Sequence, residues 1–129
     1  AVMNKRKAIH TDLAPAAIGT YSQAICVGDL VFISGQLPLL PNTMELDGQD
    51  IETQTRRVFV NLAAIAEAAG ADLNDAVKIN ISMIDLAGFA VVNTVMADYF
   101  SQPYPARACV QVAALPKNAL IEIEATLGV

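Results

Sequence analysis

The most constraining feature of this sequence is a pair of apolar segments with strand-like alternation near the C-terminus, residues 105–111 and 121–127. In the second segment, apolar side chains at every other position alternate with Glu122, Glu124 and Thr126, a pattern typical of a β-strand with one buried face. Pro116 and Asn118 between the segments favour a chain reversal. We therefore expect a hairpin with Gln111 opposite Glu122. This register would place Arg107, Cys109 and both glutamates on one face, and a slip of one residue would separate them.

The rest of the chain alternates between short strands and two helices. Strands are predicted over residues 24–27, 30–34 and 76–84, and helices over 51–69 and 86–100, with Asp50 and Asp85 as helix caps and Gly70 after the first helix. The resulting order is ββαβαββ. We expect one α+β domain over residues 1–129, a two-layer sandwich with a mixed sheet and both helices on one face. Residues 1–8 are expected to form a loosely attached N-terminal segment.

Composition limits the partners of this fold. Hydrophobic residues make up 54% of the chain and charged residues 16%, without an apolar run long enough to span a membrane. The apolar excess indicates a second buried surface, for which a homo-oligomer interface is the simplest explanation. The net charge of −5 disfavours nucleic acid as a partner. Two cysteines do not form a disulfide framework, so a cytoplasmic location is expected.

Several classes of chemistry lack their usual residues. The single histidine, His10, lies near the N-terminus, so a nucleophilic serine or cysteine has no obvious base. No spacing of histidines and cysteines indicates a metal site, and no glycine-rich phosphate loop is present. The remaining possibilities rely on positioning, one carboxylate and one cation.

The charged candidates have ordinary alternatives. Arg107 is either an anchor for a substrate carboxylate or a strand-end arginine in an ion pair at a subunit boundary. Glu122 is either a general acid/base that holds a water molecule or, with Glu124, part of a solvated strand face. Cys109 is typical of a small core residue, although its main chain could face a ligand.

The uncharged candidates are equally ambiguous. Tyr21 either packs in a loop or offers a hydroxyl to a pocket, and Ser34 and Gly35 either end a strand or face a ligand. Asn93 lies in the middle of the second predicted helix, where a polar residue on the outer face is common. The pattern alone establishes no site.

Seven sequence motifs resemble one known family. They are Ala-Pro-Ala-Ala-Ile-Gly-Thr-Tyr-Ser-Gln-Ala from Ala14, Ile-Ser-Gly-Gln from Ile33, Ala-Ala-Gly from Ala68, Phe-Ala-Val-Val-Asn from Phe89, Tyr-Pro-Ala-Arg-Ala-Cys-Val from Tyr104, Ala-Leu-Pro-Lys from Ala114 and Ile-Glu-Ile-Glu-Ala from Ile121. Together they resemble the RidA (YjgF) family. The resemblance implies a chorismate-mutase-like fold, a homotrimer with clefts between subunits, and no cofactor. It also implies hydrolysis of reactive enamines and imines, such as 2-aminoacrylate and 2-iminobutanoate, to 2-oxo acids and ammonia.

The same resemblance implies roles for individual residues. Arg107 would bind the substrate carboxylate, Glu122 would position or activate water, and the main chain of Cys109 would contact the imine or its water. Tyr21, Ser34 and Gly35 would line the cleft, and Asn93 matches a recurring position. The sequence departs from the family pattern with Thr20 in place of proline, Ala108 in place of serine, and a short segment over residues 100–104, and these departures leave the substrate range open.

Two other functions are compatible with the sequence. A trimer that binds a small carboxylate or regulates a partner without turnover would use the same cleft. An endoribonuclease or translation inhibitor, an activity reported for some relatives, is less favoured because of the acidic charge balance.

Overall fold

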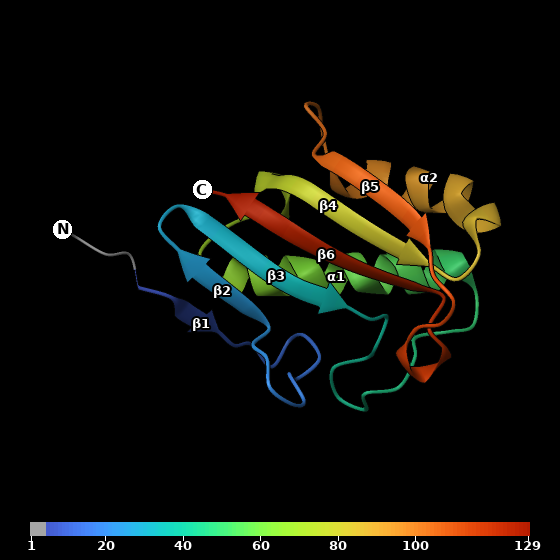
Figure 1. The fold of residues 1–129 in the computed structure, drawn as a ribbon, viewed down its shortest axis with the longest axis horizontal. Helices are drawn as coiled ribbons and strands as arrows, with labels where there is room; N and C mark the ends of the chain where they lie inside the picture. The colour runs from blue at the N-terminus through green and yellow to red at the C-terminus, as the bar shows by residue number, and fades with distance from the viewer. Residues whose placement is uncertain (1–4) are drawn as a thin grey trace.

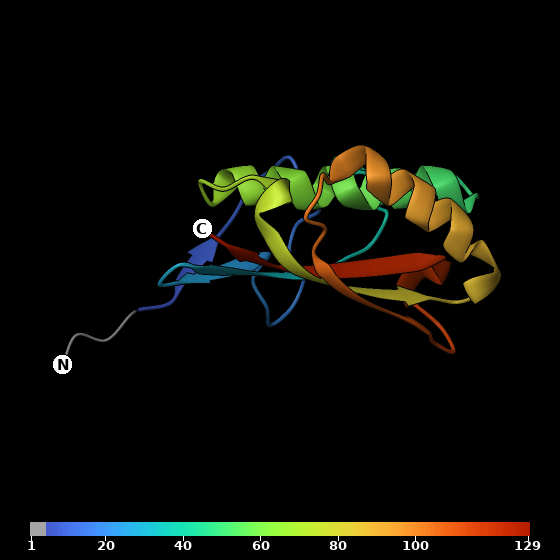
Figure 2. The ribbon, with the colours of Figure 1, turned by 90° about the horizontal axis from the view of Figure 1, so that it is seen from above.

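The computed structural model describes residues 5–129 and contains a six-stranded sheet with two α-helices on one face (Figures 1 and 2). The helices are α1 (Ile51–Ala68) and α2 (Phe89–Tyr99). The strands are β1 (Lys7–Ile9), β2 (Ala24–Val27), β3 (Leu30–Gln36), β4 (Ala76–Met83), β5 (Ala106–Gln111) and β6 (Ile121–Gly128). The short 3₁₀ helices are η1 (Leu73–Asp75), η2 (Leu86–Gly88) and η3 (Pro116–Asn118). This arrangement confirms the predicted two-layer α+β class.

The order of the strands contradicts the predicted C-terminal hairpin. The sheet runs β1-β2-β3-β6-β4-β5, so β4 separates β5 from β6. Strand β5 pairs in parallel with β4, because α2 returns the chain in the direction of β4. Strand β6 then pairs antiparallel with both β3 and β4. The predicted register of Gln111 opposite Glu122 is therefore wrong: Gln111 pairs with Met83, whereas Glu122 pairs with Ser82.

The alternation within β6 explains its central position. Its apolar residues Ile121, Ile123, Ala125 and Leu127 are all buried, and they face the layer of helices. A strand with this much apolar surface is best covered when it has a neighbour on each side and helices above it. The alternation predicted this strand correctly, whereas the predicted pairing with residues 105–111 is wrong.

The ends of α1 agree with the prediction. The Asp50 side chain accepts a hydrogen bond from the Thr53 N–H at 2.9 Å, and Gly70 follows the helix with a φ of 77°. Within the helix, Phe59 is fully buried and stacks on Tyr99 of α2 at 5.2 Å between ring centroids. These contacts fix the two helices against each other and above the sheet.

Three local details differ from the prediction. Asp85 does cap the chain after β4, but the first turn there is 3₁₀ and α2 begins at Phe89. Val77, which strand alternation with the buried Ile79 and Ile81 would place on the buried face, is 50% exposed because the pairing of β4 with β6 shifts register at that point. Lys7 and Ala8, expected in a loosely attached segment, pair with β2; the part of that prediction concerning residues 1–4 lies outside the described residues. Within residues 5–129, no helix combines the length and apolarity needed to cross a bilayer.

Candidate functional site

Arg107 extends from β5 toward α2 and is held there by three side chains. Its Nη1 donates to Asn93 Oδ1 at 2.7 Å and approaches Met96 Sδ at 3.7 Å, and its guanidinium lies 4.9 Å from the centre of the Phe89 ring. Phe89, Asn93 and Met96 share one face of α2 because they are four and three residues apart. We call Phe89, Asn93, Met96 and Arg107 the Arg107 cluster.

The guanidinium in this cluster has no anionic partner among the described residues. Arg107 takes part in none of the ion pairs formed within residues 5–129. It borders a cavity of about 360 Å³ lined by Asn93, Met96, Ala97, Tyr104, Pro105 and Arg107. A guanidinium fixed by neutral neighbours beside a cavity is suited to bind a carboxylate.

Glu122 lies in β6 on the face of the sheet that the helices leave uncovered. Its carboxyl packs against the backbone of Gly35 so closely that a Cβ added there would lie 2.9 Å from Glu122 Cδ. Burial raises the pKa of the Glu122 carboxyl above its ordinary value, and the neighbouring Glu124 carboxylate raises it further. A carboxyl with a raised pKa holds a proton more readily, which suits a group that accepts a proton and returns it.

Gly35 approaches Glu122 because β3 contains a bulge. Ile33 pairs with Ala125 and Gln36 pairs with Ile123, so two residues of β3 face one residue of β6. Ser34, the other residue of the bulge, donates from Oγ to the carbonyl of Ser22 at 2.6 Å. We call Ser34, Gly35 and Glu122 the Glu122 cluster.

Tyr21 directly precedes the residue that binds Ser34. Its side chain is 52% exposed, and its hydroxyl oxygen accepts a hydrogen bond from the Ile18 N–H at 3.3 Å. That bond uses the oxygen as acceptor and leaves the hydroxyl proton available to a ligand. The hydrogen bond from Ser34 to Ser22 thus ties β3 to the segment just before β2 that carries Tyr21.

Cys109 shares the helix-side face of β5 with Arg107. Its Sγ lies 3.7 Å from Met83 Sδ, and it packs against the core. Burial raises the pKa of the Cys109 thiol, and the nearby Arg107 guanidinium offsets part of the rise. A thiol in this setting stays protonated, which agrees with a packing role for the side chain. Because β5 is the edge strand, its main chain has one side without a strand partner among residues 5–129.

The structure does not bring Arg107 and Glu122 together within one chain. Arg107 pairs with Ile79 of β4 and Glu122 pairs with Ser82, three positions further along the same strand. Positions an odd number apart on a strand face opposite sides of the sheet. The two backbones are also separated by two strand spacings, roughly 10 Å, and by roughly 10 Å along the strands. The expectation that both charges share one face is therefore wrong.

Two members of the Arg107 cluster, Phe89 and Met96, were not predicted as site residues. Their spacing with Asn93 at i, i+4 and i+7 is visible in the sequence. What could not be read from the sequence is that β5 lies beside α2 on that face.

Comparison with known proteins gives a consistent result over nearly the whole chain. The family model described as Endoribonuclease L-PSP matches residues 11–128. The chain belongs to this family, which also contains the RidA proteins that its motifs resemble.

Two relatives and one solved structure are similar over nearly their full length. RutC family protein y4sK of Sinorhizobium fredii is 52% identical over 120 residues, covering 93% of this chain and 95% of that one. The 2-iminobutanoate/2-iminopropanoate deaminase of Dermatophagoides farinae is 43% identical over 122 residues, with 95% of each chain covered. The crystal structure of RidA from the Antarctic bacterium Psychrobacter is 56% identical, with a TM-score of 0.92 over 95% of this chain and 99% of that one.

Proposed function

We propose that this protein hydrolyses enamines and imines of 2-oxo acids, such as 2-aminoacrylate and 2-iminobutanoate, to the 2-oxo acid and ammonia. The observation that carries the proposal is the Arg107 guanidinium, which is fixed by neutral neighbours and opens on a cavity. Its free edge can bind the substrate carboxylate through two parallel hydrogen bonds. The deaminase name of a 43%-identical relative supports this class of substrate.

Glu122 would move the protons. As the oxygen of water forms a bond to the imine carbon, the Glu122 carboxylate accepts a proton from that water and returns it to the nitrogen. A second proton then passes from the new hydroxyl to the nitrogen as the carbon–nitrogen bond breaks, which releases ammonia and leaves the 2-oxo acid. The raised pKa of Glu122 suits both directions of transfer. No cofactor enters this scheme.

The complete site would form between two copies of the chain. A substrate only a few bonds long cannot touch Arg107 and Glu122 of one chain, because they lie on opposite faces of the sheet. The uncovered face also exposes the large apolar side chains Leu30, Phe32 and Val110, which are 42%, 44% and 52% exposed. A closed ring would bury this face and bring the Glu122 cluster of one copy against the Arg107 cluster of the next. We propose a homotrimer with its sites in these clefts.

The remaining candidates fit around that cleft. Tyr21 and Ser34 would line the wall that carries Glu122, and the main chain of Cys109 would contact the imine or its water beside Arg107. Asn93 would hold the guanidinium in place. A cytoplasmic location remains a prediction from the cysteine content.

A coupled assay tests the proposed function. A threonine dehydratase generates 2-iminobutanoate, semicarbazide competes for it, and the trapped product is followed with and without this protein. We expect less trapped product in the presence of the protein. Unchanged trapping together with measurable binding of 2-oxobutanoate would instead indicate a carboxylate-binding trimer without turnover. RNA cleavage by the wild type that persists in Arg107→Ala would point to a contaminant.

A further inference from the structure

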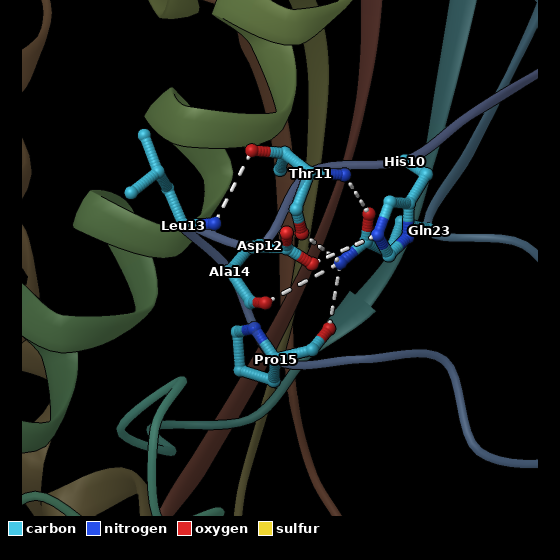
Figure 3. A network of polar contacts seen from close by, with 7 residues as sticks. All are labelled: His10, Thr11, Asp12, Leu13, Ala14, Pro15 and Gln23. Carbon is cyan, nitrogen blue, oxygen red and sulfur yellow. Dashed lines mark hydrogen bonds and ion pairs between the residues drawn. The ribbon is translucent and has the colours of Figure 1, made fainter.

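Gln23 is a buried residue to which the sequence assigned no role. It lies next to β2, and only 2% of its surface is exposed. Figure 3 shows its amide surrounded by the main chain of residues 11–15. Gln23 Oε1 accepts from the Thr11 N–H at 2.8 Å, and Nε2 donates to the carbonyls of Thr11 at 3.0 Å and Pro15 at 2.8 Å, with Ala14 at 3.4 Å.

The main chain beside Gln23 holds the β3 bulge. The carbonyl of Gln23 accepts from the Ser34 N–H at 2.9 Å, and the carbonyl of Ser22 accepts from Ser34 Oγ at 2.6 Å. At the bulge the pairing of β3 with β6 is interrupted, so these two bonds are what anchors Ser34. The next residue, Gly35, is the one against which Glu122 packs.

The same residue also closes the segment that carries Tyr21. Residues 16–22 form a closed loop. The Gln23 side chain donates to the Pro15 carbonyl before the loop, and Gln23 itself follows the loop directly before β2. The Tyr21 hydroxyl accepts from Ile18 within this closed loop. The position of Tyr21 and the position of the bulge thus depend on one side chain and its own backbone.

We propose that Gln23 is a positioning residue that sets Tyr21 and the Ser34–Gly35 bulge relative to Glu122. The glutamine amide places two N–H donors and one acceptor at the end of its side chain, as the surrounding carbonyls and the Thr11 N–H require. A buried polar group that loses such partners destabilises the local arrangement. The kinetic part of the inference rests on the proposed function, whereas the structural part does not.

The test compares two glutamines that are equally buried. Gln23→Glu keeps the shape of the side chain and removes the Nε2 donors, and Gln23→Asn keeps the amide and shortens its reach. Gln54→Glu is the matched control for the exchange measurement, since Gln54 is 1% exposed and its amide bonds the Gly48 carbonyl and the Leu120 N–H instead of residues 11–15. Amide hydrogen exchange at Ser34 and steady-state kinetics are measured for each variant.

We expect both Gln23 variants to lower the protection of the Ser34 amide by about tenfold while Gln54→Glu leaves it unchanged. We also expect kcat to fall by about tenfold or more with KM within about twofold, because the Arg107 cluster that binds the carboxylate stays intact. Wild-type protection of the Ser34 amide in a folded Gln23→Asn protein would overturn the inference. A rise in KM by the same factor as the fall in kcat would also overturn it. If the wild type shows no turnover, the proposed function fails, and the exchange at Ser34 still decides whether Gln23 positions the bulge.

Discussion

Arg107 and Glu122 lie on opposite faces of one sheet, and their surroundings affect the charge of each side chain differently. The guanidinium of Arg107 is held by an amide, a thioether and an aromatic ring, so its charge is oriented, and no carboxylate within residues 5–129 pairs with it. The carboxyl of Glu122 packs against a glycine backbone and beside a second carboxylate, so its charge is disfavoured. One region is built to attract an anion, and the other is built to exchange a proton. Substitutions that change the charge or the packing in one of the two regions test this difference.

The largest effect is expected at Arg107. Replacing it with alanine removes the bidentate partner of the substrate carboxylate, and kcat/KM should fall by about 100- to 1,000-fold. Arg107→Lys should recover only part of this loss, because an ammonium lacks the fork geometry. Arg56→Ala is the matched control, since Arg56 already pairs with Glu52 and Asp98. Equal losses for the two alanine variants would contradict the role of Arg107.

The second effect concerns the close packing at Gly35. A Cβ there would lie 2.9 Å from Glu122 Cδ, so Gly35→Ala should push the carboxyl away and lower kcat by about tenfold to 100-fold. Gly70→Ala should instead lower stability by about 1 kcal/mol through its positive φ, without changing kcat. Thermal unfolding and initial rates separate the two. Full activity in Gly35→Ala would show that the contact with Glu122 is unimportant.

A third substitution would make the Arg107 cluster resemble the Glu122 cluster in charge. Asn93→Asp places a carboxylate 2.7 Å from Nη1, where it competes with the carboxylate of the substrate. We expect KM to rise by about tenfold with a smaller change in kcat, whereas Asn93→Ala should change KM less. If Asn93→Asp lowers KM, the guanidinium does not bind the substrate carboxylate.

The smallest effect is on stability at Glu122. Because the folded state raises the pKa of this carboxyl, its ionisation opposes folding, and stability declines as pH rises from the unfolded pKa through the higher folded pKa. Glu122→Gln should remove this decline and be more stable at neutral pH by only about 0.5 kcal/mol, because solvent screens the half-exposed carboxyl, with no difference at a pH below both values. Urea unfolding at several pH values measures it, with Glu67→Gln on the exposed surface of α1 as control. A constant difference across pH would point to a cause other than ionisation.

The sequence predicted the helices and strands more accurately than it predicted which strands pair with each other. The helix over residues 51–69, its Asp50 cap and the alternation of residues 121–127 follow from local periodicity, which depends on nearby residues. The pairing of β5 with β4 depends on the path of α2, and no local pattern reports that path. Assuming that consecutive strands are adjacent therefore placed Arg107 and Glu122 on the same face.

The same limit applies to the site. The resemblance to RidA singled out Arg107 and Glu122, and the structure shows the surroundings that make each of them chemically unusual. Phe89 and Met96 were missed because their helical spacing is also typical of a core stripe. Gln23 was not predicted because its partners are main-chain groups, and every residue type carries the same main-chain carbonyl, so the sequence does not indicate these bonds.

The central claim is that one site takes Arg107 from one copy of the chain and Glu122 from another, and mixing inactive variants tests it directly. Arg107→Ala and Glu122→Gln proteins are mixed in equal amounts under conditions that exchange subunits, and deaminase activity is measured. Random exchange should restore about a quarter of the wild-type activity, because that share of clefts receives both intact residues. Wild type mixed with the double variant provides the control for exchange. Full exchange in that control with no recovery in the mixture of single variants would show that both residues act from the same chain and would contradict the account.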